Sequence, residues 1–205
     1  RFRRFRPRPE ITDPAANDVN VVLVDRRDRL WLGTWGFGVM RFDPEADRSD
    51  LGRREDALDG AHLYHLFEGG DGTIWAGARE GLFSVDPETL EVRAWVHDAD
   101  DPEGLPESPI SSVIEDHTGT LWVGTWGDWI RVLARDERSR PRPRFRRLDA
   151  ADGLLDNAIA GLLEDGNGDV WVSTSDGLFR FDRVRGVFAG YGERDGLASR
   201  RFNPK

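Results

Sequence analysis

Asp28–Thr34 reads DRLWLGT, and closely similar segments occur three more times along the chain. They are GTIWAGA at Gly72–Ala78, GTLWVGT at Gly119–Thr125 and GDVWVST at Gly168–Thr174. Each copy has one tryptophan, and these four, Trp31, Trp75, Trp122 and Trp171, are 44, 47 and 49 residues apart. Periods of about 20 to 50 residues are typical of repeat architectures, in which one unit cannot bury its apolar face alone. What is identical in all four copies is therefore expected to be scaffold.

Apolar residues at fixed distances before each tryptophan predict a first strand. Twelve positions before it stand Val19, Leu63, Ile110 and Ile159. Short β-branched and aromatic runs between turn signals are typical of strands. Each run is followed by a tight turn, at Asp28-Arg29, Asp71-Gly72, Thr118-Gly119 and Asn167-Gly168, so that the first copy has Arg29 where the turn glycine belongs. Asp-Gly and Asn-Gly favour hairpins because both central residues of a type I′ turn have positive φ.

Two more strands follow the tryptophan strand. The third reads VMRFDP, LFSVDP, WIRVLA or LFRFDR, and the fourth is less regular, as in EVRAWVHD, RPRFRRLD and VFAGYGE. Four short antiparallel strands per repeat describe one blade of a β-propeller. Helical repeats fit poorly, because the chain lacks their apolar period of about 3.6 residues. The predicted fold is all-β, a β-propeller of about four four-stranded antiparallel blades.

The repeats divide the chain into blades with expected ranges 17–58, 59–104, 105–153 and 154–196. Residues 1–8 are expected to be the outer strand of a preceding blade, and 197–205 the start of a following blade or of the link to the next module. Joining the two ends would give a blade without its middle strands. We therefore expect an arc or fragment of a larger propeller, of about seven or more blades. Such an arc leaves two blade faces bare, which predicts self-association or packing against further blades.

Composition narrows the function classes. Hydrophobic residues make up 38% of the chain and charged residues 33%, as in globular proteins. A net charge of −9 gives no overall attraction to nucleic acid or to an anionic membrane, so neither is an expected partner. The chain has no cysteine and therefore no thiol chemistry. It shows no signal peptide and no apolar run of membrane-spanning length, and its sole methionine is Met40, so we expect a section of a longer protein.

Two segments carry a family resemblance: GLPESPISSVIEDHTGTLWVGTWGDWIRV from Gly104 and DGLLDNAIAGLLEDGNGDVWVSTSDGLFRFD from Asp152. They strongly resemble the two-component regulator propeller repeat, and the resemblance extends over essentially the whole chain. Departures are one extra residue, Phe37, in the first copy and Asp128 in place of the second glycine in the third copy.

The resemblance implies a periplasmic sensor propeller of a bacterial hybrid histidine kinase or sensor diguanylate cyclase. In that family a smaller immunoglobulin-like module, a membrane span and a cytoplasmic signalling output usually follow. The segment itself is then expected to be non-catalytic, without cofactor or metal.

The candidate ligand site lies four and five residues after each tryptophan, where the copies differ. These pairs are Trp35-Gly36, Arg79-Glu80, Trp126-Gly127 and Ser175-Asp176, to which we add Asp128 and, from the loops before the first strands, His62 and Asn157. Aromatic rings beside charged and amide groups suit a small polar ligand such as an oligosaccharide. The alternative is that Trp35 and Trp126 cap the propeller face or pack blade on blade.

Other conspicuous residues are interpreted as structural. The four repeated tryptophans have apolar flanks, so core packing is expected. Acids recur at one corner of every copy, as at Asp25, Glu68, Asp116 and Asp165, which favours turn hydrogen bonds over a pair of catalytic carboxylates. The four histidines lack metal-ligand spacing.

The favoured function is a ligand-sensing propeller segment of a signal-transduction receptor. Two alternatives stay open: a propeller enzyme, a lyase or glycosidase with catalytic residues in its loops, or a platform for protein interactions.

Overall fold

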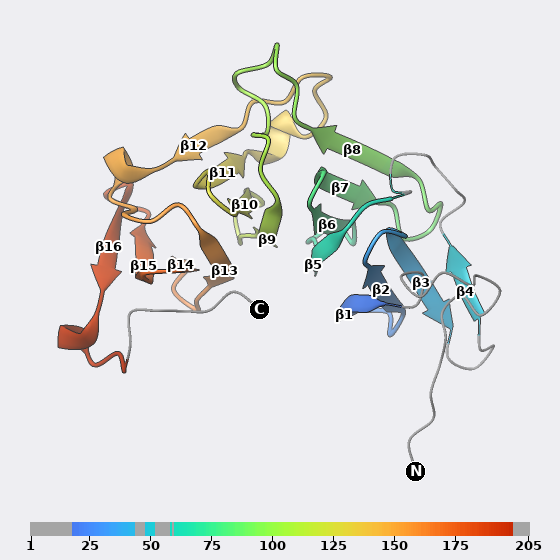
Figure 1. The fold of residues 1–205 in the computed structure, drawn as a ribbon, viewed down its shortest axis with the longest axis horizontal. Helices are drawn as coiled ribbons and strands as arrows, with labels where there is room; N and C mark the ends of the chain where they lie inside the picture. Colours follow the sequence, from blue (N-terminus) through green and yellow to red (C-terminus); the bar gives the residue numbers. More distant parts are fainter. Residues whose placement is uncertain (1–17, 44–47, 52–57, 59, 199–205) are drawn as a thin grey trace. The chain divides into compact units, whose positions relative to one another are not determined.

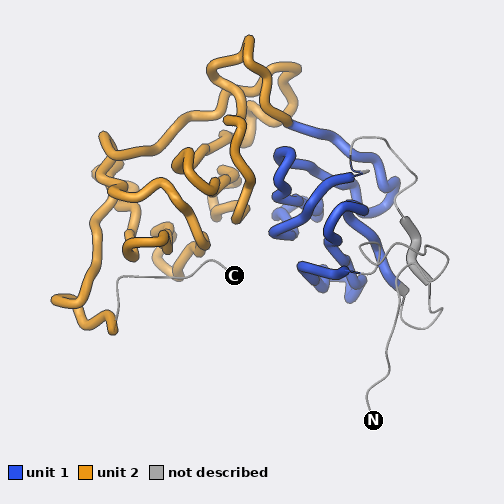
Figure 2. Tube along the Cα trace, in the orientation of Figure 1, with its two compact units in different colours: residues 1–95 blue, residues 96–205 orange. Residues whose placement is uncertain are grey.

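The computed structural model describes residues 18–43, 48–51, 58 and 60–198, and this part of the chain forms four separate four-stranded antiparallel sheets (Figure 1). In every sheet each strand pairs with its neighbour along the chain. The chain divides into two compact units, residues 1–95 and 96–205 (Figure 2). The all-β prediction is confirmed. The strand expected at 1–8 and most of the segment 197–205 lie outside the described residues.

Unit 1 holds the first two sheets. The strands of the first sheet are β1 (Val19–Val24), β2 (Leu30–Thr34), β3 (Val39–Asp43) and β4 (Arg48–Leu51). Those of the second are β5 (Leu63–Glu68), β6 (Ile74–Ala78), β7 (Gly81–Val85) and β8 (Val92–Val96). A common apolar core, which includes Trp31, Leu63 and Phe83, lies between the two sheets.

Unit 2 holds the third and fourth sheets. The strands of the third are β9 (Ile110–Glu115), β10 (Leu121–Thr125), β11 (Ile130–Leu133) and β12 (Arg146–Leu148). Those of the fourth are β13 (Ile159–Glu164), β14 (Val170–Thr174), β15 (Gly177–Asp182) and β16 (Val187–Tyr191). One-turn 3-10 helices follow β11, β12 and β16, at Arg135–Glu137, Ala150–Asp152 and Glu193–Asp195.

In three of the four copies, the repeated tryptophan is held by an aspartate six residues earlier. In the third sheet Trp122 donates its indole Nε1–H to Asp116 Oδ2 at 2.6 Å, and Asp116 Oδ1 accepts the backbone N–H groups of Thr118 and Thr120. The same indole bond joins Trp31 to Asp25 at 2.9 Å and Trp171 to Asp165 at 2.8 Å. One carboxylate therefore closes the hairpin turn and orients the ring, which confirms the structural interpretation of these three corner acids.

The expectation that Arg29 takes the place of the turn glycine is wrong. The residue with positive φ in the first hairpin is Asp28, at 60°, and it corresponds to Gly72, Gly119 and Gly168 of the other hairpins. Aspartate is among the few non-glycine residues that enter the left-handed region readily, so the turn keeps its shape without glycine. Arg29 instead directly precedes β2 and donates its Nε–H to Asp25 at 2.6 Å.

Packing between neighbouring sheets uses the glycine two residues after the tryptophan. A Cβ atom on Gly33 would lie 2.9 Å from Leu63 Cβ on the adjacent sheet, and one on Gly124 would lie 2.6 Å from Ile159 Cγ2. Within each unit the second strand of one sheet therefore lies directly on the first strand of the next. That contact places the loop after β2 beside the segment before β5, and the loop after β10 beside the segment before β13.

Of the four repeated tryptophans, three are buried as expected: Trp31, Trp75 and Trp122 are 1%, 3% and 3% exposed. Trp171 is only partly buried, and its ring packs against Tyr191 with centroids 5.1 Å apart. Trp75 makes the equivalent contact with Trp95 at 5.3 Å. The rings thus also hold the outer strand of their own sheet.

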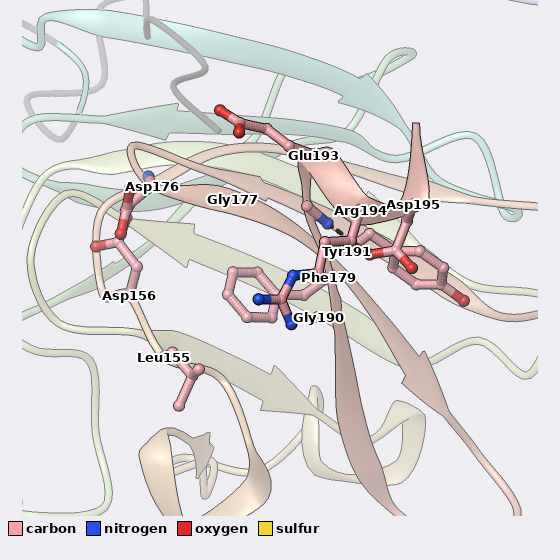
Figure 3. Close-up of a pocket in the computed structure, with 11 residues that line it drawn as sticks. Leu155, Asp156, Asp176, Gly177, Phe179, Gly190, Tyr191, Glu193, Arg194 and Asp195 are labelled. Atoms are coloured by element: carbon pink, nitrogen blue, oxygen red, sulfur yellow. Dashed lines mark hydrogen bonds between the residues drawn. The ribbon is translucent and has the colours of Figure 1, made fainter. Parts of the chain in front are cut away.

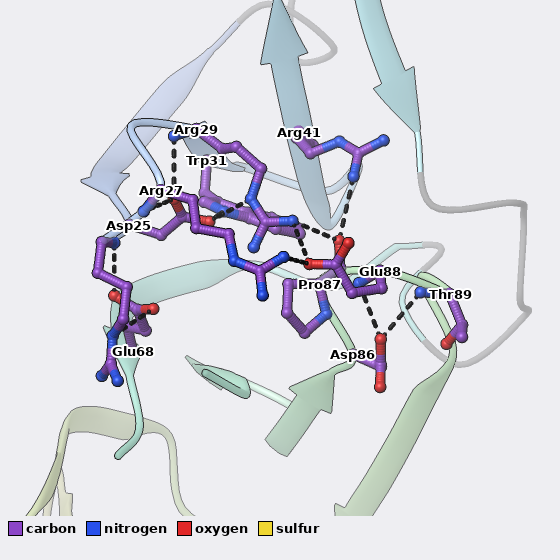
Figure 4. Close-up of polar contacts among 11 residues, drawn as sticks. Asp25, Arg27, Arg29, Trp31, Arg41, Glu68, Asp86, Pro87, Glu88 and Thr89 are labelled. Carbon is purple, nitrogen blue, oxygen red and sulfur yellow. Dashed lines mark hydrogen bonds and ion pairs between the residues drawn. The ribbon is translucent and has the colours of Figure 1, made fainter. Parts of the chain in front are cut away.

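A glutamate at the end of the first strand links neighbouring sheets. Glu68 accepts the backbone N–H of Arg26 at 2.8 Å and its Nε at 2.9 Å, and Glu164 accepts the backbone N–H of His117 at 2.8 Å. Figure 4 shows the unit 1 contacts, where the Arg29 guanidinium also reaches Glu88 at 2.7 Å. Each unit therefore has a polar clamp at its hairpin turns.

Candidate functional site

In unit 1, four residues of different elements meet in a cluster, here called the Trp35 cluster: Trp35, His62, Tyr64 and Glu80. Trp35 follows β2 and forms an isolated bridge with His62, which precedes β5. Trp35 is 38% exposed, and two rings stand nearly perpendicular to its indole, with ring centroids 5.2 Å away for His62 and 5.4 Å away for Tyr64. A solvent-facing indole, supported from the side by two further rings, is a preformed platform for an apolar ring face.

Glu80 fixes the imidazole of this cluster. Its carboxylate accepts the His62 backbone N–H at 3.0 Å and lies 2.9 Å from His62 Nδ1. The second ring nitrogen, Nε2, faces the loop at Gly36, where a Cβ atom would lie 3.9 Å away. Burial raises the pKa of the Tyr64 hydroxyl, so this group stays protonated and can donate a hydrogen bond. The cluster offers an exposed indole, an imidazole, a phenol and a carboxylate.

Arg79 joins this group through its backbone, since its N–H donates to the His62 carbonyl at 3.0 Å. The structure therefore brings together four of the residues selected from the sequence: Trp35, His62, Arg79 and Glu80. Tyr64 was not selected. The alternation of side chains along a strand was the available signal, because Tyr64 stands two residues after His62.

In unit 2, the expected residues form two groups. In the first, Asn157 Nδ2 donates to the Gly127 carbonyl at 2.8 Å, and the Gly127 and Trp129 N–H groups donate to the Asn157 carbonyl. Asn157 thus holds the loop that carries Trp126 and Asp128. The Asn157 side-chain amide therefore stabilises this loop through its hydrogen bond to the Gly127 carbonyl.

The second group contains Ser175 and Asp176. Asp156 accepts the Ser175 hydroxyl at 2.7 Å and the backbone N–H groups of Asp176 and Ala158 at 2.8 and 3.1 Å. These hydrogen bonds outweigh the opposing effect of burial and lower the pKa of Asp156, which stays ionised. Asp156 was missed from the sequence, where it reads as an ordinary turn acid beside Asn157.

The expected departures in these loops need correction. Thr34 N–H bonds to the Gly38 carbonyl and Thr125 N–H to the Trp129 carbonyl, so the first and third loops have equal length and Phe37 is no unique insertion. The residue equivalent to Gly38 is Trp129 rather than Asp128. Trp129 has a φ of 65°, a conformation that a bulky side chain rarely adopts.

The fourth sheet borders a pocket of about 580 Å³ (Figure 3). Asp156 and Asp176 lie together in its wall, and the rings of Phe179 and Tyr191 and the turn that carries Arg194 contribute the rest of the lining. Among the described residues no group of three or more histidines and acids is placed to hold a metal ion. The described helices include none long and apolar enough to cross a membrane.

Residues 13–36, 104–127 and 153–176 match the family model described as a two-component regulator propeller. None of the curated proteins compared with the sequence matches it. Among solved structures, the extracellular domain of a hybrid two-component system of B. thetaiotaomicron is similar, with a TM-score of 0.73 and 21% identity over 90% of this chain and 24% of that one.

Virginiamycin B lyase from Staphylococcus aureus is also similar, with a TM-score of 0.68 and 11% identity over 92% of this chain and 59% of the lyase. A protein described as a gluconolactonase has a TM-score of 0.63 and 14% identity over 89% of this chain and 65% of that protein. At these identities the likeness shows the fold, a β-propeller. The chain spans about a quarter of the extracellular domain, so its four sheets correspond to part of a larger propeller.

Proposed function

Because the chain carries two-component regulator propeller repeats, we propose that it is a non-catalytic, ligand-sensing segment of an extracytoplasmic receptor. In bacteria such a receptor passes its signal to a kinase or cyclase in the cytoplasm, and this segment lies in the periplasm. The ligand is a small polar molecule with an apolar face, such as an oligosaccharide, and the Trp35 cluster binds it.

The half-exposed indole of Trp35 carries this proposal. Sugars present a flat apolar face that stacks on an indole, while their hydroxyls bond to groups at its rim. Here that rim consists of His62, Tyr64 and Glu80, and the rings of the first two stand nearly perpendicular to the indole, with centroids 5.2 and 5.4 Å away. Because Glu80 already holds the imidazole at 2.9 Å, the site is preorganised and loses little side-chain entropy on binding.

The binding residues come from two neighbouring sheets, and this arrangement offers a way to transmit a signal. Trp35 directly follows a strand of the first sheet, whereas Tyr64 lies in β5 of the second sheet and His62 and Glu80 lie next to strands of that sheet. A ligand that touches all four has higher affinity for one spacing of the two sheets than for others. Binding therefore shifts the population toward that spacing, and further blades and subunits respond to it.

Calorimetric titration of the chain with a panel of neutral oligosaccharides tests the proposal, with product analysis of the same mixtures. We expect saturable binding of at least one member without turnover. Trp35→Ala should weaken it by about tenfold or more, and Glu80→Gln by a smaller factor. Glu91→Gln, an exposed acid on the turn before β8, is the matched control and should bind like the parent. Binding that persists undiminished in Trp35→Ala would sink the site assignment.

One observation favours an enzyme as a second candidate. A carboxylate that holds one imidazole nitrogen and leaves the other exposed is the usual support of a general base. Glu80 lies 2.9 Å from His62 Nδ1 in this way, and the second nitrogen, Nε2, faces the loop at Gly36. Turnover of a bound oligosaccharide that is lost in His62→Asn would establish the enzyme, a lyase or glycosidase, and overturn the sensor. The third alternative, a protein-interaction platform, predicts no small-molecule binding and no effect of Trp35→Ala.

A further inference from the structure

The pocket of the fourth sheet has an occupied counterpart in the third sheet. Strand pairing fixes the equivalence: Phe179 of β15 faces Gly190 of β16, as Arg131 of β11 faces Arg147 of β12. Gly177 likewise corresponds to Trp129, because Thr174 Oγ1–H bonds to the Gly177 carbonyl in the same way as Thr125 Oγ1–H bonds to the Trp129 carbonyl.

In the third sheet, the chain's own side chains fill this place. The Arg131 guanidinium donates to Asp128 at 2.9 Å, and the Arg147 guanidinium lies 6.0 Å from the Trp129 ring and bonds to Asp149 at 3.0 Å. Arg131 is only 9% exposed. This face thus consists of two guanidinium groups, held by two carboxylates beside an indole.

In the fourth sheet, glycines replace three of these residues. Gly177 stands for Trp129, Gly190 for Arg147 and Gly192 for Asp149, while Phe179 stands for Arg131. The three missing side chains leave the pocket of about 580 Å³, within the range of small-molecule sites. The pocket therefore includes the places that correspond to the indole and to one guanidinium of the third sheet.

Asp128, the carboxylate that binds Arg131 in the third sheet, has a counterpart in the fourth sheet, Asp176, whereas Arg131 itself is replaced by Phe179. Asp176 precedes Gly177 as Asp128 precedes Trp129, and each backbone N–H bonds to the threonine hydroxyl of its loop, at 3.3 and 3.0 Å. Asp156 adds a second carboxylate beside Asp176, ionised and held in place by three hydrogen bonds. Two adjacent carboxylates thus line a pocket that takes the place of the Arg147 guanidinium, although Asp149, which binds that guanidinium in the third sheet, is itself replaced by Gly192.

We infer that this pocket binds a small organic cation with a guanidinium or ammonium group. The cation pairs with Asp176 and Asp156, and its apolar stem lies on Phe179, which is 4% exposed and forms the floor beside Gly190. The lining has four carboxylates, Asp156, Asp176, Glu193 and Asp195, against a single cation, Arg194. An anionic ligand is disfavoured by that charge, and a neutral sugar gains less than a cation from it.

The test is calorimetric titration of the chain with L-arginine and agmatine, and with L-citrulline as the neutral counterpart of arginine. We expect saturable binding of the two cations at concentrations up to about 10 mM, weakening as salt is raised, and at least tenfold weaker binding of citrulline. Asp176→Asn, an exposed substitution that keeps side-chain volume, should weaken arginine binding about tenfold or more. Gly190→Arg, which copies the third sheet, should abolish it.

Equal binding of citrulline and arginine, unchanged affinity in Asp176→Asn, or no binding of either cation would overturn this inference. The outcome is independent of the proposed oligosaccharide site. Trp35→Ala lies in unit 1 and should leave arginine binding unchanged, whereas Asp176→Asn should leave oligosaccharide binding unchanged.

Discussion

Asp116→Asn replaces one carboxylate oxygen of a buried turn residue with an amide NH₂ group. The side chain of Asp116 is fully buried. Its Oδ2 accepts Trp122 Nε1 at 2.6 Å and Arg183 Nη2 at 2.9 Å, while its Oδ1 accepts two backbone N–H groups and the Thr118 hydroxyl. If the asparagine oxygen stays with the backbone, its NH₂ group replaces Oδ2 and faces two donors.

Hydrogen bonds to a charged group contribute about 1.5–3 kcal/mol each, and leaving a buried donor unsatisfied costs a similar amount. The Arg183 side chain is 25% exposed and can turn toward water, so the loss of its hydrogen bond should cost an amount near the lower limit of this range. We therefore expect Asp116→Asn to lower the free energy of unfolding by about 3 kcal/mol. Urea unfolding followed by tryptophan fluorescence and circular dichroism measures this. Glu193→Gln, an exposed acid, is the control and should change stability by less than about 0.5 kcal/mol. A loss below about 1 kcal/mol in Asp116→Asn would refute the corner's role.

Three further predictions concern the scaffold. Burial alone would raise the pKa of Asp25, but hydrogen bonds from Trp31 and Arg29 lower it from 3.8 to about 2. The contribution of Asp25 to stability should therefore be complete above pH 4 and disappear as the pH falls from about 4 to 2. Urea midpoints measured against pH should show this loss in the parent protein, and the Asp25→Asn variant should not show it. Glu68→Gln weakens the link to Arg26 and should cost about 1 kcal/mol in urea unfolding, and an unchanged midpoint would count against the clamp. Gly124→Ala places a Cβ atom 2.6 Å from Ile159 and should destabilise by about 1–3 kcal/mol, whereas Gly166→Ala, with no neighbouring atom within 4 Å, should be neutral in the same thermal melt; equal melting temperatures would contradict the proposed close approach.

Much of the fold could be predicted because the strands repeat. Columns such as Val19, Leu63, Ile110 and Ile159 are apolar in every copy, and chance does not produce that pattern four times. In the first copy, the search for a turn glycine leads to Arg29, which is the wrong position. The backbone requires only a residue that tolerates positive φ, and this residue need not be glycine. Asp28 does so with a φ of 60°.

The candidate site could be predicted in part. Loop columns that differ between copies led to Trp35, His62 and Glu80, which the structure places in contact. The pocket of the fourth sheet could not be found in this way, because its main feature is the absence of side chains. In the sequence, Gly177 and Gly190 look like ordinary strand and turn residues, and only strand pairing shows that they occupy the places of Trp129 and Arg147.

The central claim is that the repeated tryptophans support the fold, whereas Trp35, in a loop that differs between the copies, meets the ligand. The eight tryptophans have indole N–H groups that report on this division in one nitrogen–proton NMR spectrum. During titration with an oligosaccharide that binds, we expect the Trp35 indole resonance to shift. Those of Trp31, Trp122 and Trp171, hydrogen-bonded to their aspartates, should stay in place. A titration that moves these three signals and leaves Trp35 unchanged would contradict the account.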